Sequence, residues 1–119
     1  MTLRSLSRRV IGAAMFSLLL VACAAPAAST APVATNQIDL PPSYKFEPKV
    51  ITVPDGTEVT WTNRDNFTHS VRLLDDGGDV KQIAPGESVS FTFHGVGEHN
   101  YDCSFHPNDM NGVVIVTAN

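Results

Sequence analysis

The sequence has no apolar run long enough to cross a membrane as a helix. Its N-terminal run, Val10 to Ala22, has 13 residues, whereas a membrane-spanning helix needs about 20. Arg4, Arg8 and Arg9 stand before this run, and a basic start followed by a short apolar segment is typical of an export signal. We therefore predict that residues 1–22 are a signal peptide and not a membrane span.

Basic residues are also scarce. Once residues 1–22 are removed, five Lys and Arg residues stand against 12 Asp and Glu residues, which gives the mature chain a formal charge of −7. This charge repels polyanions and argues against a nucleic-acid-binding protein, while it favours basic protein partners. The length of 119 residues suits a single domain.

The chain has only two cysteines, Cys23 and Cys103, which would by default form a disulfide in an exported protein. Cys23, however, ends the stretch L-V-A-C, which resembles the lipobox of bacterial lipoproteins; an ordinary cleavage site beside a cysteine is the alternative. In a lipoprotein this cysteine is lipidated and becomes the first residue of the mature chain. Cys103 would then have no partner, and an unpaired thiol in an oxidising compartment is expected to be buried or bound to a metal.

The same N-terminal segment bears on export and location. Ser7 to Ile11 reads S-R-R-V-I and resembles a twin-arginine signal, so Sec and twin-arginine export both remain open. Residues 23–36 are small, prolyl and uncharged, and they predict a flexible linker that reaches roughly 40 Å when extended. We expect an exported protein, lipid-anchored through Cys23 to the extracytoplasmic face of a bacterial membrane, in the periplasm or at the cell surface.

No stretch long enough for a helix has the helical period, and the pattern after residue 37 is that of β-strands. Apolar and polar residues alternate in the short runs 51–53, 59–62 and 89–93, and a fourth run spans 113–117. Turn sequences rich in Gly, Pro and Asp separate these runs. The last run is uniformly β-branched and predicts a strand that is covered on both faces. We expect residues 37–119 to form one all-β sandwich with antiparallel or mixed strands. Trp61 and the phenylalanines should supply its core.

Three possible metal ligands stand close together near the C-terminus, in Y-D-C-S-F-H-P-N-D-M-N-G (101–112). They are Cys103, His106 and Met110, and His69 at another strand end supplies a second imidazole. Two imidazoles, a thiolate and a thioether are the ligands of blue copper sites, with methionine as the long axial ligand. Zinc fits less well because its protein sites use no thioether. The pattern predicts one copper ion, cycling between Cu(I) and Cu(II), if the fold brings these strand ends together.

Residues 44–117 resemble the cupredoxins, and the amicyanin, plastocyanin and pseudoazurin group in particular. The likeness rests on F-E-P-K-V-I-T-V-P-D-G-T-E-V-T-W-T-N (46–63), on the segment around His69, and on G-E-H-N-Y-D-C-S-F-H-P-N-D-M-N-G-V-V-I-V (97–116). The resemblance implies a small Greek-key β-sandwich that holds one type 1 copper at the four positions and transfers single electrons. It also implies redox protein partners and a monomeric domain without enzymatic activity.

Three positions depart from the family pattern. The gap between His106 and Met110 is three residues, between the gaps of two and four found in amicyanin-like and plastocyanin-like loops, which makes Met110 the least secure ligand. Ser70 stands where the family usually has an asparagine that ties the two ligand loops together. Phe105 stands where proline is common.

Other polar and aromatic residues have both structural and functional interpretations. His99 shares strand parity with Cys103 and is predicted to be a structural core histidine, whereas His94 beside a glycine turn should be solvated. Neither completes a second copper centre, which argues against a nitrite-reductase-like enzyme. Two sets of residues each allow two interpretations. Asp75, Asp76 and Asp79 could form an acidic docking patch or only a turn. Phe67, Phe105 and Pro107 could form an apolar collar around His106 or only exclude water from the metal.

The function expected from the sequence is that of a blue copper electron carrier with a basic redox partner, such as a cytochrome. The alternative on the same fold is copper storage, delivery or sensing. Exposed Met-rich or His-rich tracts would favour delivery, and the chain has none beyond the four ligands. A metal-free adhesion sandwich is the third hypothesis.

Overall fold

The strands of this protein are short and are joined by tight turns. The structure is a computed structural model and describes residues 31–119; the predicted signal peptide and Cys23 lie outside this part of the chain. Its strands are β1 (Val33–Ala34), β2 (Gln37–Leu40), β3 (Val50–Pro54), β4 (Glu58–Asn63), β5 (His69–Leu73), β6 (Val80–Ile83), β7 (Ser88–Thr92), β8 (Gly97–Asp102) and β9 (Asn111–Thr117). The described residues contain no helix that is long and apolar enough to cross a membrane.

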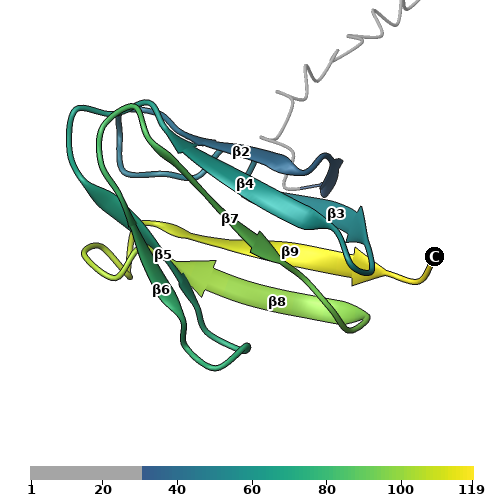
Figure 1. Ribbon diagram of the computed structural model, residues 1–119. Coiled ribbons are helices and arrows are strands. Elements are labelled where there is room, and N and C mark those ends of the chain that lie inside the picture. Colours follow the sequence, from purple (N-terminus) through teal and green to yellow (C-terminus); the bar gives the residue numbers. More distant parts are fainter. Residues whose placement is uncertain (1–30) are drawn as a thin grey trace, which may run out of the picture.

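Two sheets lie face to face in the molecule (Figure 1). One has six strands in the order β1-β3-β9-β8-β5-β6, and the other has three in the order β2-β4-β7. β3 runs parallel to both β1 and β9, and β2 runs parallel to β4. The remaining pairs are antiparallel. The prediction of an all-β sandwich is confirmed. Of the two strand arrangements that we expected, the structure has the mixed one.

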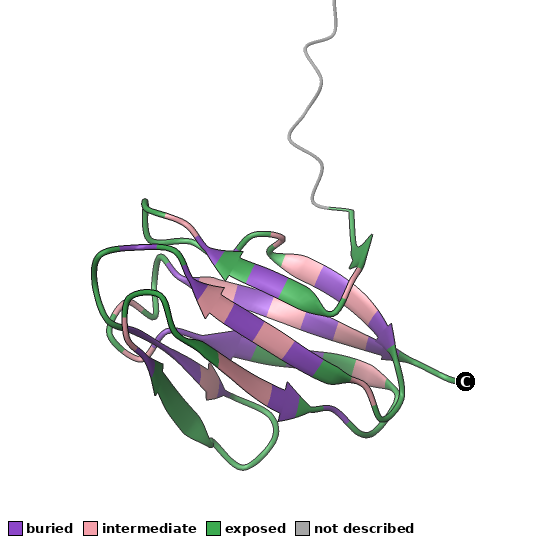
Figure 2. Cartoon of the chain, turned by 45° about the horizontal axis from the view of Figure 1, so that its top comes forward, coloured by how far each residue is buried: buried purple, intermediate pink, exposed green. Residues whose placement is uncertain are grey.

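The core lies between the sheets and follows the alternation of the sequence. Buried and more exposed residues alternate along most strands (Figure 2). Trp61 is fully buried, and its ring is T-shaped to those of Phe91 and Tyr101, with centroids 6.0 and 5.2 Å apart. The predicted core is confirmed for Trp61 and for Phe46, Phe91 and Phe93, whereas Phe67 and Phe105 are exposed.

Strand β9 corrects one prediction. Val114 and Val116 are buried, but Val113 and Ile115 between them are only partly buried. The strand is hydrogen-bonded along both edges, by β3 and β8, but only one of its faces meets the other sheet. Its β-branched composition therefore reflects a central position in the sheet and not coverage on both faces.

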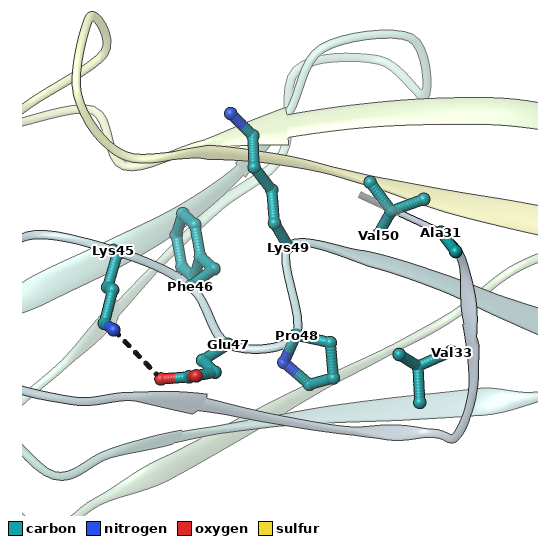
Figure 3. A pocket seen from close by; sticks show the side chains of 8 residues that line it. All are labelled: Ala31, Val33, Lys45, Phe46, Glu47, Pro48, Lys49 and Val50. Carbon is teal, nitrogen blue, oxygen red and sulfur yellow. Dashed lines mark ion pairs between the residues drawn. The ribbon is translucent and has the colours of Figure 1, made fainter. Parts of the chain in front are cut away.

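The predicted linker also needs correction at its C-terminal end. Val33 and Ala34 pair in parallel with Ile51 and Thr52, so they belong to the six-stranded sheet. A pocket of about 380 Å³ lies beside this edge (Figure 3). It is lined by Ala31, Val33, Lys45, Phe46, Glu47, Pro48, Lys49 and Val50, which include none of the four candidate ligands.

The turns follow the glycines of the sequence. Gly56 and Gly86 both have a φ of 81°, in the left-handed region that glycine adopts without steric cost. Gly56 lies in the turn between β3 and β4, and Gly86 lies in the turn between β6 and β7. The start of β5, the end of β8 and the start of β9 lie together at one end of the sandwich (Figure 1). The candidate ligands lie there.

Candidate metal centre

Strand pairing brings the candidate ligands to one place. β5 starts with His69, Cys103 directly follows β8, and Met110 directly precedes β9. β8 is the neighbour of both β5 and β9 in the sheet. The ends of three adjacent strands therefore position three of the four candidates.

The loop from Cys103 to Met110 is held by its own backbone. The N–H of Cys103 donates to the carbonyl of Met110 at 3.0 Å, and the N–H of Met110 donates to the carbonyl of His106 at 2.9 Å. The N–H of His106 in turn donates to the carbonyl of Cys103 at 3.0 Å. The three-residue gap before Met110 thus forms a closed turn, and the Met110 side chain is fully buried.

His69 and Cys103 face each other in the interior. His69 Nδ1 lies 4.0 Å from Cys103 Sγ, and neither residue is exposed. The other ring nitrogen, Nε2, lies 2.8 Å from Oδ2 of Asp65. A carboxylate can only accept, so the ring proton of a neutral His69 is on Nε2 and the lone pair of Nδ1 points to the sulfur side. This is the orientation that a metal-binding imidazole requires.

Asp65 belongs to the candidate site, and the sequence reasoning did not identify it. Its carboxylate accepts hydrogen bonds from His69 and from the N–H of Asn66, the latter at 2.7 Å. These bonds, with that from His69 foremost, lower the pKa of Asp65 below its ordinary value. Asn63 supports the loop, because its Oδ1 accepts from the N–H of Asp65 at 2.8 Å. An acid four residues before a candidate histidine is the only signal that the sequence offered.

His106 is the most exposed of the four candidates. It is partly exposed, and its ring centre lies 6.1 Å from that of His69. Within residues 31–119 no three His, Cys, Asp or Glu side chains gather closely enough to hold an ion. That Met110 is the least secure of the four ligands stays a prediction; its side chain is fully buried.

Tyr44 is the second residue that sequence reasoning missed. Its ring stands edge-on to that of His106, with centroids 4.6 Å apart, and lies 6.1 Å from that of His69. Tyr44 has a φ of 53° and Ser43 a φ of 108°, both unusual for residues other than glycine. This backbone turn puts the tyrosine ring beside His106, a contact that the sequence P-P-S-Y does not predict.

A family model described as a cupredoxin-like domain matches residues 12–116. The chain belongs to the cupredoxin-like family. It is 36% identical over 83 residues to the chloroplastic plastocyanin of Tetradesmus obliquus, covering 60% of this chain and 57% of that protein. It is 28% identical over 102 residues to amicyanin-alpha of Methylorubrum extorquens, covering 82% of this chain and 84% of the relative. The expected resemblance is thus confirmed, and cupredoxins of this kind bind a type 1 copper.

Solved structures of similar fold support the same assignment. A purple cupredoxin from Nitrosopumilus maritimus superposes with a TM-score of 0.59 at 31% identity, over 68% of this chain and 98% of its own. A copper-containing nitrite reductase from Thermus scotoductus superposes with a TM-score of 0.59 at 30% identity, over 79% of this chain. That match covers only 24% of the reductase chain. The cupredoxin fold predicted from the sequence is confirmed.

The other histidines of this cupredoxin lie where the sequence predicted. His99 is buried, with 9% of its surface exposed, and His94 is exposed. His99 Nδ1 lies 2.7 Å from Oδ2 of Asp76, and its Nε2 lies 2.7 Å from the carbonyl oxygen of Gly95. His99 is therefore a structural residue that connects two loops.

The acidic turn after β5 is hydrogen-bonded to β8. Asp75 accepts from the backbone and the side chain of Asn100, at 2.7 and 2.9 Å, so the turn is fastened to β8. The structural interpretation of this turn is supported, and Asp79 is exposed.

Two aromatic residues next to candidate ligands in the sequence lie at the surface. Phe67 and Phe105 are 61% and 48% exposed, which favours a collar at the surface over a buried water barrier.

Proposed function

We propose that this cupredoxin is a blue copper electron carrier that binds one copper ion through His69, Cys103, His106 and Met110. Bound copper would supply a one-electron couple between Cu(I) and Cu(II). No substrate needs to reach the metal, because outer-sphere transfer takes place through the protein. Membership of the cupredoxin-like family is established, and the assignment of these four residues as copper ligands is the proposal.

The observation that supports it best is the relation of His69 to Cys103. An imidazole nitrogen lies 4.0 Å from a buried thiol, while the other nitrogen of the ring is already bound by Asp65. A free cysteine in an exported protein is prone to oxidation, and thiolate–imidazole pairs are the strong ligands of blue copper. A simple core cysteine would not require an oriented, buried histidine beside it.

The chain would assist transfer in two ways. The hydrogen-bonded loop and the buried Met110 limit rearrangement between oxidation states. The partly exposed His106, with Tyr44 and Phe105 near the surface, would give electrons a route to a partner. The acidic character of the chain favours a basic redox protein, which would bind weakly and briefly.

The function can be tested by loading the purified protein, with Cys23 retained, with Cu(II) and recording its visible spectrum and voltammogram. We expect an intense thiolate-to-copper band and a reversible one-electron wave. Cys103→Ser should abolish the band, while Cys23→Ser, which removes the only other thiol, should preserve it. A blue Cys103→Ser protein would show that the ligands are assigned wrongly. A complex that exchanges copper readily and does not cycle would instead support storage or delivery.

We also propose that the protein is exported, is lipid-anchored through Cys23, acts as a monomer and has no enzymatic activity. Labelling with a radioactive fatty acid should mark the wild-type protein and not Cys23→Ser, which should move to the soluble fraction. Labelling of both would refute the anchor. Nitrite turnover by the copper-loaded domain would refute the carrier role.

A further inference from the structure

Arg72 and Asp102 form an ion pair beside the candidate metal centre. Arg72 lies on β5, which begins with His69, and Asp102 is the last residue of β8, directly before Cys103. The two residues are paired across these antiparallel strands. Nε and Nη2 of Arg72 donate hydrogen bonds of 2.8 and 2.6 Å to Oδ1 and Oδ2 of Asp102. A charged pair of defined geometry therefore joins the two strands that carry His69 and Cys103.

The negative charge of this pair is more buried than the positive charge. The Asp102 side chain is 6% exposed, whereas that of Arg72 is 34% exposed. The hydrogen bonds to Asp102, and to a smaller extent the charges of Asp102 and Cys103, outweigh the effect of burial and raise the pKa of Arg72 above its ordinary value. The guanidinium group therefore stays charged. Both charges are fixed near Cys103, because Asp102 is its neighbour in the chain and Arg72 is bound to Asp102.

A fixed charge beside a redox metal shifts the reduction potential in a direction that depends on its sign. Oxidation adds one positive charge to copper, so a nearby carboxylate favours Cu(II) and a nearby guanidinium group favours Cu(I). Water and salt screen such interactions at an exposed site, but they screen buried or partly buried charges much less. Asp102 alone would lower the potential, and Arg72 opposes this effect.

We propose that Arg72 and Asp102 are a charge-balancing pair of the copper site, in which Asp102 lowers the reduction potential and Arg72 raises it. The inference rests on the proposed function, since it takes Cys103 as a copper ligand. It requires that removal of either charge shifts the potential, and that the two shifts have opposite signs. A purely structural pair would behave differently, because loss of either partner would loosen the same two strands.

The test is voltammetry of the copper-loaded protein, read as the Cu(I)/Cu(II) ratio at a fixed applied potential. In Asp102→Asn this ratio should shift toward Cu(I) by about tenfold, the order expected for one charge in a partly buried site. Arg72→Gln, measured at about pH 8, where carboxyl groups are ionised, should shift it about as far toward Cu(II). Arg72→Lys keeps the charge and should stay within about twofold of the wild type, as should the double variant Arg72→Gln with Asp102→Asn.

Arg64 and Asp39 provide the matched control. Their side chains form an ion pair at 3.2 Å and are 62% and 52% exposed. Arg64→Gln and Asp39→Asn change the net charge of the protein exactly as the test variants do, but solvent and salt screen the charges that they remove. Neither control should shift the Cu(I)/Cu(II) ratio by more than about twofold.

Urea denaturation of the metal-free protein tests the ion pair without copper. Arg72→Gln should lower the denaturation midpoint, because it leaves a buried carboxylate without its cation. Addition of Asp102→Asn should recover part of this loss, since no buried charge then remains. If Arg72→Gln fails to fold, the voltammetry of Asp102→Asn against Asp39→Asn still gives the sign and size of the effect.

The outcomes separate this inference from the copper assignment. Shifts of the same sign in Arg72→Gln and Asp102→Asn, or an unchanged potential in the folded variants, would overturn the charge-balancing role. Losses of stability that simply add in the double variant would show that the two side chains are not coupled. A wild-type protein that binds copper without the thiolate band would refute the proposed function instead.

Discussion

Oδ2 of Asp65 lies 2.8 Å from Nε2 of His69, and both side chains are buried. The pair fixes the ring so that Nδ1 is turned toward Cys103. A carboxylate behind a metal-binding histidine also raises the basicity of the ligand. Asp65 should therefore strengthen copper binding without touching the metal.

Replacing Asp65 by alanine should lower the affinity for Cu(II) by about 10- to 100-fold, the usual effect of removing a hydrogen-bond partner of a metal ligand. Competition with a chelator of known affinity measures the change. Asp65→Asn keeps an acceptor and should fall between alanine and wild type. Asp39→Ala removes an exposed acid, whose partner is Arg64 at 3.2 Å, and should bind as wild type does. Wild-type affinity in Asp65→Ala would contradict the role given to this carboxylate.

Local sequence pattern predicted much of the fold. Alternation in runs such as that around Trp61 marks one face as buried, and glycines mark the turns, because both depend on near neighbours in the chain. The pairing of Val33–Ala34 with β3 was missed, since two residues are too few to show a period. The coverage of β9 was overestimated because composition reports the strand's place in the sheet as well as its burial.

The candidate site was only partly predictable for a similar reason. The spacing of Cys103, His106 and Met110 is visible in the sequence, and a sandwich brings His69 to the same end. Tyr44 depends on two left-handed residues in a turn, and Asp65 depends on a side-chain direction. Tyr44 has no sequence pattern of its own, and an acid four residues before a histidine does not by itself indicate a contact, so both residues were identified from the structure.

Gly112 is the place where the backbone can least accept a side chain. A Cβ at this position would lie 2.6 Å from the carbonyl oxygen of Lys49 and even closer to the hydroxyl of Tyr101. Gly112→Ala should lower the free energy of unfolding by about 3 kcal/mol, at the upper end of overpacking costs. Urea denaturation of the metal-free domain measures it.

Tyr101 provides the companion variants for this prediction. Its buried hydroxyl has no hydrogen-bond partner among the described residues, so Tyr101→Phe should change stability by less than about 1 kcal/mol. Tyr101→Phe combined with Gly112→Ala should recover little of the loss, because the clashes with the ring carbon Cζ of residue 101 and with the Lys49 carbonyl both remain. A fully stable Gly112→Ala protein would show that the two strands can separate at little cost.

Met110 should set the potential more than the stability. It is fully buried, and replacement by leucine conserves volume, so the cost in unfolding free energy should stay below about 1.5 kcal/mol. Loss of the axial donor destabilises Cu(II) more than Cu(I), so Met110→Leu should keep the blue colour and raise the potential. Met110→Gln offers a harder oxygen donor and should lower it. Voltammetry that gives the same potential for all three proteins would remove Met110 from the ligand set.

His99 connects the turn after β5 to the turn before β8, through Asp76 Oδ2 and the carbonyl of Gly95. Both partners accept hydrogen bonds, so both ring nitrogens are best satisfied when the histidine is protonated. Burial by itself would lower the pKa of His99, but the hydrogen bonds to Gly95 and Asp76 and the charges of Asp76 and Asp75 outweigh it and raise the pKa above its ordinary value. Phe93 packs edge-on to the ring and adds no charge.

A raised pKa in the folded state ties stability to pH in a defined direction. Below about pH 6.5, the pKa of an unperturbed histidine, the protonated His99 contributes its full stabilisation, and this is lost as the pH rises through the higher pKa of the folded state. Urea denaturation of the metal-free domain at a series of pH values should therefore show stability falling from about pH 6.5 upward. His99→Phe should remove this component, whereas His94→Phe, which changes an exposed histidine, should keep it. An equal pH dependence in wild type and His99→Phe would mean that His99 is neutral in the folded protein, with Nδ1 facing Asp76 without a proton between them.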